Sequence, residues 1–258
     1  MIKGRAISSG KAEGKVLKLD GTFSFLGGVN ASTGDLNVRE GNIAGKVFVF
    51  PGGKGSTVGS FVMYDLMVHG KAPAAIINES AETIVTTGAV ISSIPMVDRI
   101  DMNVLKEGDD VIVDGDTGTI EIKGTKSVKV VSSAILRDGK ILILQRPGNA
   151  KSFPGRKSLV AGKIETGEIP EAAAAREIME ETAISVSAPD SVLSPVFVRE
   201  DDIIWEVHPF LFKVDDADPV LNKENVGFEW ISPDKIADDP SVVPLTHRVV
   251  NEMIMGLK

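Results

Sequence analysis

The sequence predicts an α/β protein made of two domains. Its 258 residues exceed the usual length of one domain, and 43% of them are hydrophobic, which is enough to build two cores. Short β-branched runs alternate with segments of helical spacing. A small polar stretch at 124–127 interrupts this pattern, which then restarts, so we expect domains at residues 1–124 and 125–258.

The first domain reads as short strands separated by glycine turns. Runs of apolar and β-branched residues predict strands at 45–50, at 74–77, from Met96 and at 110–113. Two alternating runs about a Gly/Asp turn predict a hairpin over 110–122 that closes the domain, and a second hairpin near 10–14 is expected to open it.

Two helices are expected between these strands. Phe61, Tyr64 and Val68 have the spacing of one helix face, and Gly70 stands where a helix-ending glycine belongs. A second short helix is expected over 83–92. These elements form strand–helix–strand units.

The second domain repeats the mixture of strands and helices without an internal repeat of the first. Apolar runs predict strands at 128–131, 134–136, 140–145, near Val196 and at 209–212. Helices are expected over 170–181, 233–236 and 245–255.

Composition excludes several classes of function. Acidic side chains outnumber basic ones by 36 to 28, and the net charge of −8 argues against a general grip on nucleic acid. The sequence contains no cysteine, which excludes thiolate zinc sites, a cysteine nucleophile and an iron–sulfur cluster held by this chain. No signal-peptide pattern or apolar run of membrane-spanning length is present, so we expect a cytoplasmic protein with no membrane partner.

The most informative segment places four carboxylates around one predicted helix. Glu168 precedes the helix, whereas Glu177, Glu180 and Glu181 stand at i, i+3 and i+4 and share one face. Like charges this close repel, and Mg²⁺ or Mn²⁺ would compensate them, since hard divalent ions prefer carboxylate oxygens. The alternative is a solvated acidic helix face.

This segment resembles the Nudix hydrolase signature, which is Gly, five residues, Glu, seven residues, then Arg-Glu-aliphatic-any-Glu-Glu-any-Gly-aliphatic. The residues in register are Gly162, Glu168, Arg176, Glu177, Ile178, Glu180, Glu181 and Ile184. Ala183 stands where the family usually has glycine, and Ala161 replaces the first glycine of the common pair.

The resemblance implies a Nudix α/β/α sandwich that hydrolyses a diphosphate-containing small molecule with magnesium or manganese. Glu180 and Glu181 would be the principal metal ligands, Glu177 a ligand or general base, and the carbonyl of Ala161 a further ligand. Glu168 and Arg176 would form an orienting pair. A later segment, 223–230, is similar to a family segment whose glutamate assists metal or water, which indicates Glu224.

Several residues near this signature are candidates for substrate contacts. Arg146, with Lys151 or Arg156, would meet phosphate or a base, or would be a surface charge. The aromatic residues Phe153, Trp205 and Phe210 would stack on a base or belong to the core. The three histidines have no motif neighbours and receive no role.

The first domain carries a glycine-rich loop between a predicted strand and helix, with the sequence Pro51-Gly52-Gly53-Lys54-Gly55-Ser56-Thr57. Such a turn exposes backbone N–H groups that favour an anion. It is not a P-loop, because Lys54 precedes Gly55 and Ser56 instead of following them. A tight turn, or a helix cap by Ser56 or Thr57, is the structural alternative.

Residues 3 to about 122 resemble the small, swivelling β/β/α subunit of the aconitase X family, which includes phosphomevalonate dehydratases. The matching segments are 24–29, 33–34, 45–47, 51–60 and 72–76. The resemblance implies that Ser56 acts as the base of a dehydration, with Gly52, Gly53, Lys54 and Gly55 binding the substrate. It also implies a separate large subunit that holds an iron–sulfur cluster.

Two functions remain open at this point. The first is a magnesium-dependent Nudix hydrolase with an appended swivel domain. The alternative is a partner-dependent dehydratase subunit whose Nudix-like part is regulatory or inactive. In the first domain, Asn37 and Glu40 stand where the aconitase X family has Asp and His. The swivel domain would then be either a contributor of Ser56 or a ligand-binding or docking module. The joined domains suggest a link to isoprenoid phosphates.

Overall fold

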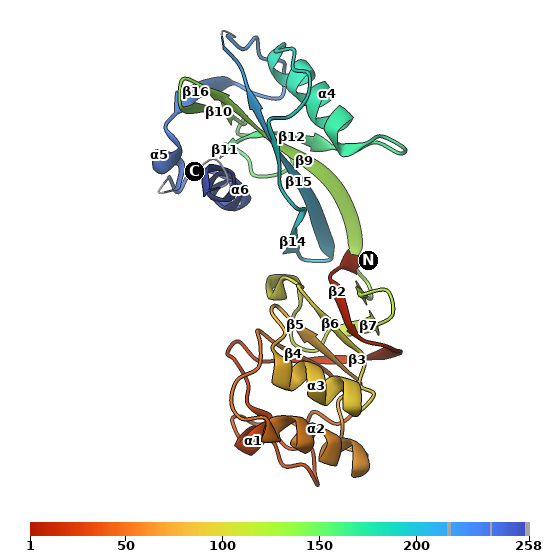
Figure 1. Ribbon diagram of the computed structural model, residues 1–258. Helices are drawn as coiled ribbons and strands as arrows, with labels where there is room; N and C mark the ends of the chain where they lie inside the picture. The colour runs from red at the N-terminus through yellow and green to blue at the C-terminus, as the bar shows by residue number, and fades with distance from the viewer. Residues whose placement is uncertain (216–217, 238, 256–258) are drawn as a thin grey trace. The chain divides into compact units, whose positions relative to one another are not determined.

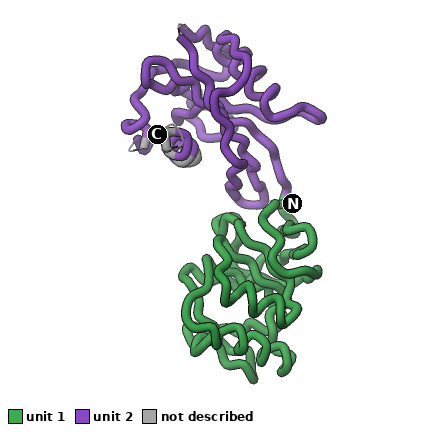
Figure 2. Tube along the Cα trace, viewed as in Figure 1, with its two compact units in different colours: residues 1–125 green, residues 126–258 purple. Residues whose placement is uncertain are grey.

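The computed structural model describes residues 1–215, 218–237 and 239–255. The chain divides into two compact units, Met1–Thr125 and Lys126–Lys258, which Figure 2 colours separately. We call them unit 1 and unit 2 and describe each by itself. Within the described ranges, no helix is long and apolar enough to cross a membrane.

Unit 1 is built on one eight-stranded sheet with the strand order β1-β8-β7-β3-β4-β5-β6-β2. The strands are β1 (Ile2–Lys3), β2 (Arg5–Ser8), β3 (Lys11–Lys18), β4 (Val47–Phe50), β5 (Ala75–Asn78), β6 (Met96–Asp98), β7 (Asp110–Asp114) and β8 (Thr119–Ile122). Strands β3 to β6 pair in parallel, as expected for strand–helix–strand units, and β7 and β8 form the antiparallel hairpin that the sequence predicts.

Three α-helices and a 3₁₀ turn complete unit 1: α1 (Phe25–Gly28), α2 (Val58–Val68), α3 (Thr83–Ile91) and η1 (Met102–Val104). Helices α2 and α3 lie on the same side of β4 and β5 (Figure 1). The core between them contains Phe48 and Phe50 from the sheet and Met63 and Leu66 from α2. The carboxylate of Glu82 caps α3 by accepting hydrogen bonds from the first backbone N–H groups of that helix.

The face of α2 that packs on the core differs from the one its spacing suggested. Phe61, Tyr64 and Val68 are exposed, whereas Met63 and the small residue Gly59 are buried. Gly59 of α2 and Gly88 of α3 permit close packing of the two helices. A Cβ atom at Gly88 would lie 2.2 Å from the Met63 sulfur. The apolar spacing therefore marks the solvent side of this helix.

The hairpin expected near residues 10–14 is not formed. Strand β2 pairs with β6 at one edge of the sheet, while β3 pairs with β4 and β7. Gly10 reverses the chain with φ +108°, but its N–H donates to the Asp116 carboxylate at 3.1 Å. Pairing with distant strands thus replaces the local pairing.

Unit 2 is also built on a sheet, whose central order is β11-β10-β9-β15-β13; β12 pairs with β9, β14 with β15 and β16 with β10. The strands are β9 (Lys126–Arg137), β10 (Lys140–Gln145), β11 (Lys157–Ser158), β12 (Val160–Lys163), β13 (Ser191–Val192), β14 (Val196–Glu200), β15 (Ile203–Lys213) and β16 (Gly227–Ile231). The two strands expected at 128–131 and 134–136 form one continuous strand, β9.

The helices of unit 2 are α4 (Pro170–Thr182), α5 (Pro233–Ala237) and α6 (Pro244–Met255). Figure 1 shows α4 on one side of the strands and α6 on the other. Two separate core clusters match this arrangement: Ala174 and Ile178 of α4 belong to one, and Val249 and Met253 of α6 to the other. Unit 2 is therefore an α/β/α sandwich.

Buried Asp98 provides a test of unit 1. Its carboxylate is 1% exposed and accepts hydrogen bonds from Arg5 at 2.9 and 2.7 Å and from the Ala81 N–H at 3.0 Å. Burial raises its pKa, but these hydrogen bonds outweigh burial and hold the pKa below the ordinary 3.8. The folded state thus favours the charged form, and its stabilisation is complete above pH 3.8 and is lost as the pH falls through the lower folded pKa.

We expect Asp98→Asn to destabilise unit 1 by roughly 1–3 kcal/mol at pH 7, with the difference from the unaltered protein shrinking below about pH 4. Far-UV circular dichroism during urea unfolding measures this. Both tryptophans, Trp205 and Trp230, lie in unit 2, so their fluorescence transition should not move. Asp110→Asn is the control, because its ion pair with Lys15 is half exposed. Equal effects of both substitutions would contradict the assignment.

Candidate active site

The sequence of helix α4 suits the start and the end of a helix. Pro170 stands in the first turn, where its missing N–H needs no partner, and alanines follow it. At the other end Ala183 adopts a left-handed conformation with φ 56°, and its N–H donates to the Met179 carbonyl at 2.9 Å. The alanine thus makes the turn that glycine makes more easily.

Arg176 gathers the carboxylates around this helix. It donates to both oxygens of Glu168, at 2.9 and 3.0 Å, and to Glu177 at 2.7 Å, and it approaches Glu180 at 3.4 Å. It also donates to the Lys163 carbonyl at 3.0 Å. Hydrogen bonds from Arg176 and from the Glu165 N–H lower the pKa of Glu168 to about 2. The structure therefore brings these predicted residues together and fixes the loop of Glu168 to the helix.

Glu181 is the most deeply placed of the four carboxylates. It is 5% exposed; one oxygen accepts a hydrogen bond from the Asn225 side chain at 2.7 Å, and the other from the Ala161 N–H at 3.4 Å. Burial, together with the neighbouring charges of Glu177 and Glu224, raises its pKa to about 7, although these two hydrogen bonds act to lower it. Glu181 is thus held rigidly in surroundings that oppose its charge.

Glu177 stands directly against the backbone of β12. A Cβ atom added at Gly162 would lie about 2 Å from its carboxylate, so a larger residue there would displace the Glu177 side chain. Burial raises the pKa of Glu177; Arg176 lowers it, while Glu180 and Glu224 raise it. The Glu224 side chain itself lies on the exposed segment that follows Asn222.

The donor set fits a hard divalent cation. The charges of Glu180 and Glu224 raise the pKa of Glu177, and those of Glu177 and Glu224 raise the pKa of Glu181. A cation that prefers carboxylate oxygens would relieve that repulsion. Gly162 provides the space beside Glu177. Over the part of the chain that the structure describes, however, no three acidic, histidine or cysteine side chains are already gathered as a metal cage.

Asn225 was missed from the sequence, although its neighbour Glu224 was singled out. It is 6% exposed and links the segment before β16 to Glu181. An amide between charged and apolar residues has no distinctive spacing, so only the fold reveals its role.

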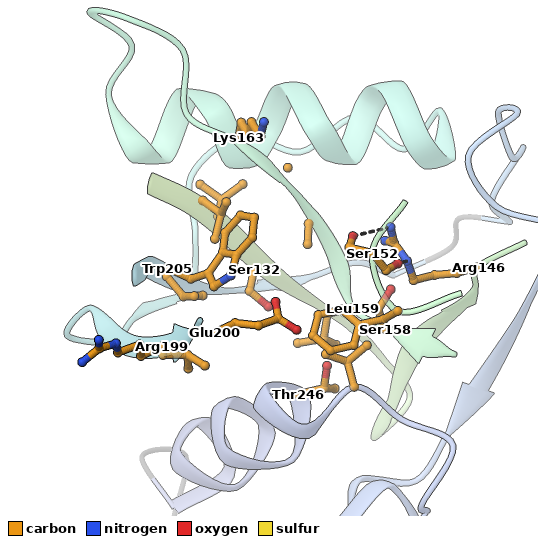
Figure 3. A pocket seen from close by; sticks show the side chains of 18 residues that line it. Ser132, Arg146, Ser152, Ser158, Leu159, Lys163, Arg199, Glu200, Trp205 and Thr246 are labelled. Carbon is orange, nitrogen blue, oxygen red and sulfur yellow. Dashed lines mark hydrogen bonds between the residues drawn. The ribbon is translucent and has the colours of Figure 1, made fainter. Parts of the chain in front are cut away.

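A cavity of about 410 Å³ borders the same strand, β12 (Figure 3). Its walls come from β9, β12, β14, β15 and the start of α6 and are mostly apolar. Phe153 and Trp205 line it, whereas Phe210 is buried in the core. Arg146 also lines it and donates to the Ser152 carbonyl at 3.0 Å and hydroxyl at 3.2 Å. Arg156 instead contacts the carbonyls of Pro240 and Val242.

The glycine-rich loop of unit 1 lies between β4 and α2. Phe23 exchanges backbone hydrogen bonds of 3.0 Å with Gly52 and Lys54. A Cβ at Gly52 would lie 2.6 Å from the Ser80 carbonyl oxygen, and Gly55 has φ +111°. The loop thus requires its glycines, and it leaves Lys54 and Ser56 exposed.

The other residues singled out from the sequence of unit 1 are Ser56, in this loop, and Asn37 and Glu40. The Ser56 hydroxyl accepts a 3.4 Å hydrogen bond from the Val58 N–H, whereas Thr57, the N-cap residue of α2, makes no side-chain capping hydrogen bond. Asn37 donates to the Gly27 carbonyl at 3.0 Å, and Glu40 is exposed.

The three histidines lie in both units. His69 contacts the Asp65 carbonyl, His208 the Glu206 carboxylate and His247 the Asp239 carbonyl.

Comparison with known proteins gives the family of each unit. The aconitase X swivel domain matches residues 1–122, and the NUDIX domain matches residues 127–250. The small subunit of phosphomevalonate dehydratase from Thermococcus kodakarensis is 55% identical over 126 residues, which cover 47% of this chain and 95% of that protein. The chain joins an aconitase X swivel domain to a NUDIX domain. Both family resemblances, and the two α/β folds that they imply, are thereby confirmed.

Solved structures also match each unit. The aconitase X of Thermococcus kodakaraensis is 55% identical and covers 46% of this chain and 95% of its own, with a TM-score of 0.46. The MutT protein of Methanosarcina mazei is 23% identical and covers 54% of this chain and 99% of its own, with a TM-score of 0.49.

The left-handed Ala183 yields a prediction. We expect Ala183→Gly to stabilise unit 2 by about 0.5–1 kcal/mol, because glycine adopts this conformation without the cost that a Cβ imposes. Ala172→Gly, at an exposed position inside α4, should instead destabilise it by about 1 kcal/mol. Urea unfolding followed by tryptophan fluorescence measures both. Destabilisation by Ala183→Gly would show that the turn is not strained.

Proposed function

We propose that unit 2 is a hydrolase that cleaves a diphosphate linkage in a small molecule with the help of Mg²⁺ or Mn²⁺. The observation that carries this proposal is the fixed, buried Glu181 beside Glu177 on α4 of a NUDIX domain. Glu181 is held by two neutral donors, the Asn225 amide and the Ala161 N–H. A buried carboxylate held in this way is costly and is characteristic of a functional site.

Glu177, Glu180, Glu181 and the Ala161 carbonyl would hold the cation. When bound, it would neutralise charge that develops on the diphosphate and make water a better nucleophile. Arg176 and Glu168 keep the loop and helix in register. Glu224, which lies close enough to raise the pKa of Glu177 and Glu181, would accept the proton of the attacking water.

In this reaction the water oxygen bonds to phosphorus, one bridging P–O bond breaks, and two phosphorylated products leave. The cavity beside β12 would hold the organic part of the substrate, because β12 contributes both to its wall and to the contacts of Glu177 and Glu181. Arg146 would contact the substrate at that wall.

Activity tests the proposal directly. We expect phosphate or monophosphate release, with Mg²⁺, from at least one of these classes: nucleoside triphosphates, oxidised nucleotides, ADP-ribose, dinucleoside polyphosphates and isoprenoid diphosphates. Glu181→Gln should lower kcat by more than about 100-fold, because it removes a metal ligand. Asn225→Ala should lower kcat by roughly 10- to 100-fold, because it removes the hydrogen bond that positions Glu181. Glu171→Gln, at an exposed site in the first turn of α4, should leave activity unchanged.

Two results would contradict the hydrolase. One is no turnover of any class by a folded protein. The other is turnover that survives Glu181→Gln, which would place the chemistry elsewhere.

A second function is favoured by unit 1. We propose that it acts as the small subunit of a dehydratase in which Ser56 accepts the proton when water is eliminated from a hydroxylated substrate. Its support is 55% identity over 95% of a phosphomevalonate dehydratase small subunit, together with the exposed loop of Ser56. The loop N–H groups and Lys54 would stabilise the serine alkoxide, and Gly52, Gly53 and Gly55 would allow the substrate to approach the backbone.

The small-subunit function predicts reconstitution. Mixed with the large subunit of the Thermococcus kodakarensis enzyme, the chain should support water loss from phosphomevalonate, and Ser56→Ala should lower that rate by at least about 100-fold. Thr57→Ala is the matched control. If Ser56→Ala leaves the rate unchanged in an active mixture, Ser56 is not the base.

A further inference from the structure

Helix α2 carries an unpartnered apolar face. Val58, Phe61, Tyr64 and Val68 are 46%, 68%, 46% and 61% exposed. Their spacing places them within one third of the helix circumference. We call these four residues the α2 outer face. The opposite side of the helix, with Met63 and Leu66, already fills the core of unit 1.

This face is larger than a chance exposure. Single exposed apolar residues are common, but four of them along a helix about 16 Å long form a continuous strip. Leu26 of α1 is a further exposed apolar residue, 47% exposed, in the segment that packs against the start of α2 at Gly59. Aromatic side chains such as Phe61 and Tyr64 are enriched in protein interfaces.

The strip begins at the loop of Ser56. This loop leads directly into α2 and leaves Lys54 and Ser56 exposed. A serine must be shielded from water and supplied with neighbouring groups before it can act as a base. A surface that covers the loop would therefore also cover the first residues of the α2 outer face.

We infer that the α2 outer face forms the docking surface for the large subunit of a dehydratase. The inference rests on the proposed small-subunit function, whose relatives of nearly the same length as unit 1 are named small subunits. It adds which surface is buried on assembly. Asp65 and His69, which contact each other at 3.2 Å, border the face with polar groups, as expected of an interface rim.

The test is binding, measured apart from catalysis. The probe is the purified large subunit of the Thermococcus kodakarensis phosphomevalonate dehydratase, with its own small subunit as the positive control. Calorimetry should show that this chain binds and that Phe61→Ser and Val68→Ser each weaken binding at least tenfold. Val192→Ser, at a 54% exposed valine of unit 2, is the control and should bind as the unaltered chain does.

The outcomes separate the surface from the function. If the chain binds but neither substitution weakens binding, the surface is wrong and the small-subunit function stands. If the chain does not bind while the positive control does, both are wrong. If the chain alone forms dimers that Phe61→Ser dissociates, the face binds a second copy and the inference is overturned. We expect unchanged unfolding curves for both variants, because both side chains are exposed. Such curves exclude loss of fold as the cause of weaker binding.

Discussion

Repulsion among the carboxylates of α4 is the constraint on which the arrangement of unit 2 depends. Glu177 and Glu181 are placed where burial opposes their charge, and hydrogen bonds from neighbouring groups hold them there. Arg176 joins the helix to the Glu168 loop, and Asn225 joins it to the segment before β16. The backbone of β12 completes the enclosure, and Gly162 is what allows that close approach.

The sequence predicted this constellation well because it is local. Spacing at i, i+3 and i+4 places side chains on one face regardless of tertiary context, and the strand at 140–145 and the helix from Pro170 were likewise set by short patterns. The contacts of Asn225 and the walls of the cavity could not be predicted in this way. They join segments far apart in the chain, and serine, threonine or asparagine at those positions has no characteristic period.

Two errors in unit 1 share one physical origin. The strands on either side of Gly10 did not pair with each other, because β2 pairs with β6 and β3 pairs with β4 and β7. Helix α2 turned Gly59, Met63 and Leu66 to the core, because Gly59 and Gly88 permit close packing between α2 and α3. Hydrophobic spacing identifies an amphipathic helix, but it does not say whether the apolar face meets the core of the same unit or another surface.

The two candidate sites differ in how complete they are. In unit 2 the carboxylates, their cationic partner and a cavity belong to the same fold. In unit 1 the glycine-rich loop is also held in place, by backbone hydrogen bonds with Phe23 and by close contact with Ser80. Its Ser56 is nevertheless exposed, and the α2 outer face adjoins it. A backbone that tolerates only glycine is costly to keep for a turn alone. That cost is understandable if, as proposed, unit 1 supplies one side of a site and another protein supplies the other. The proposed hydrolase of unit 2 would need only its substrate and a cation.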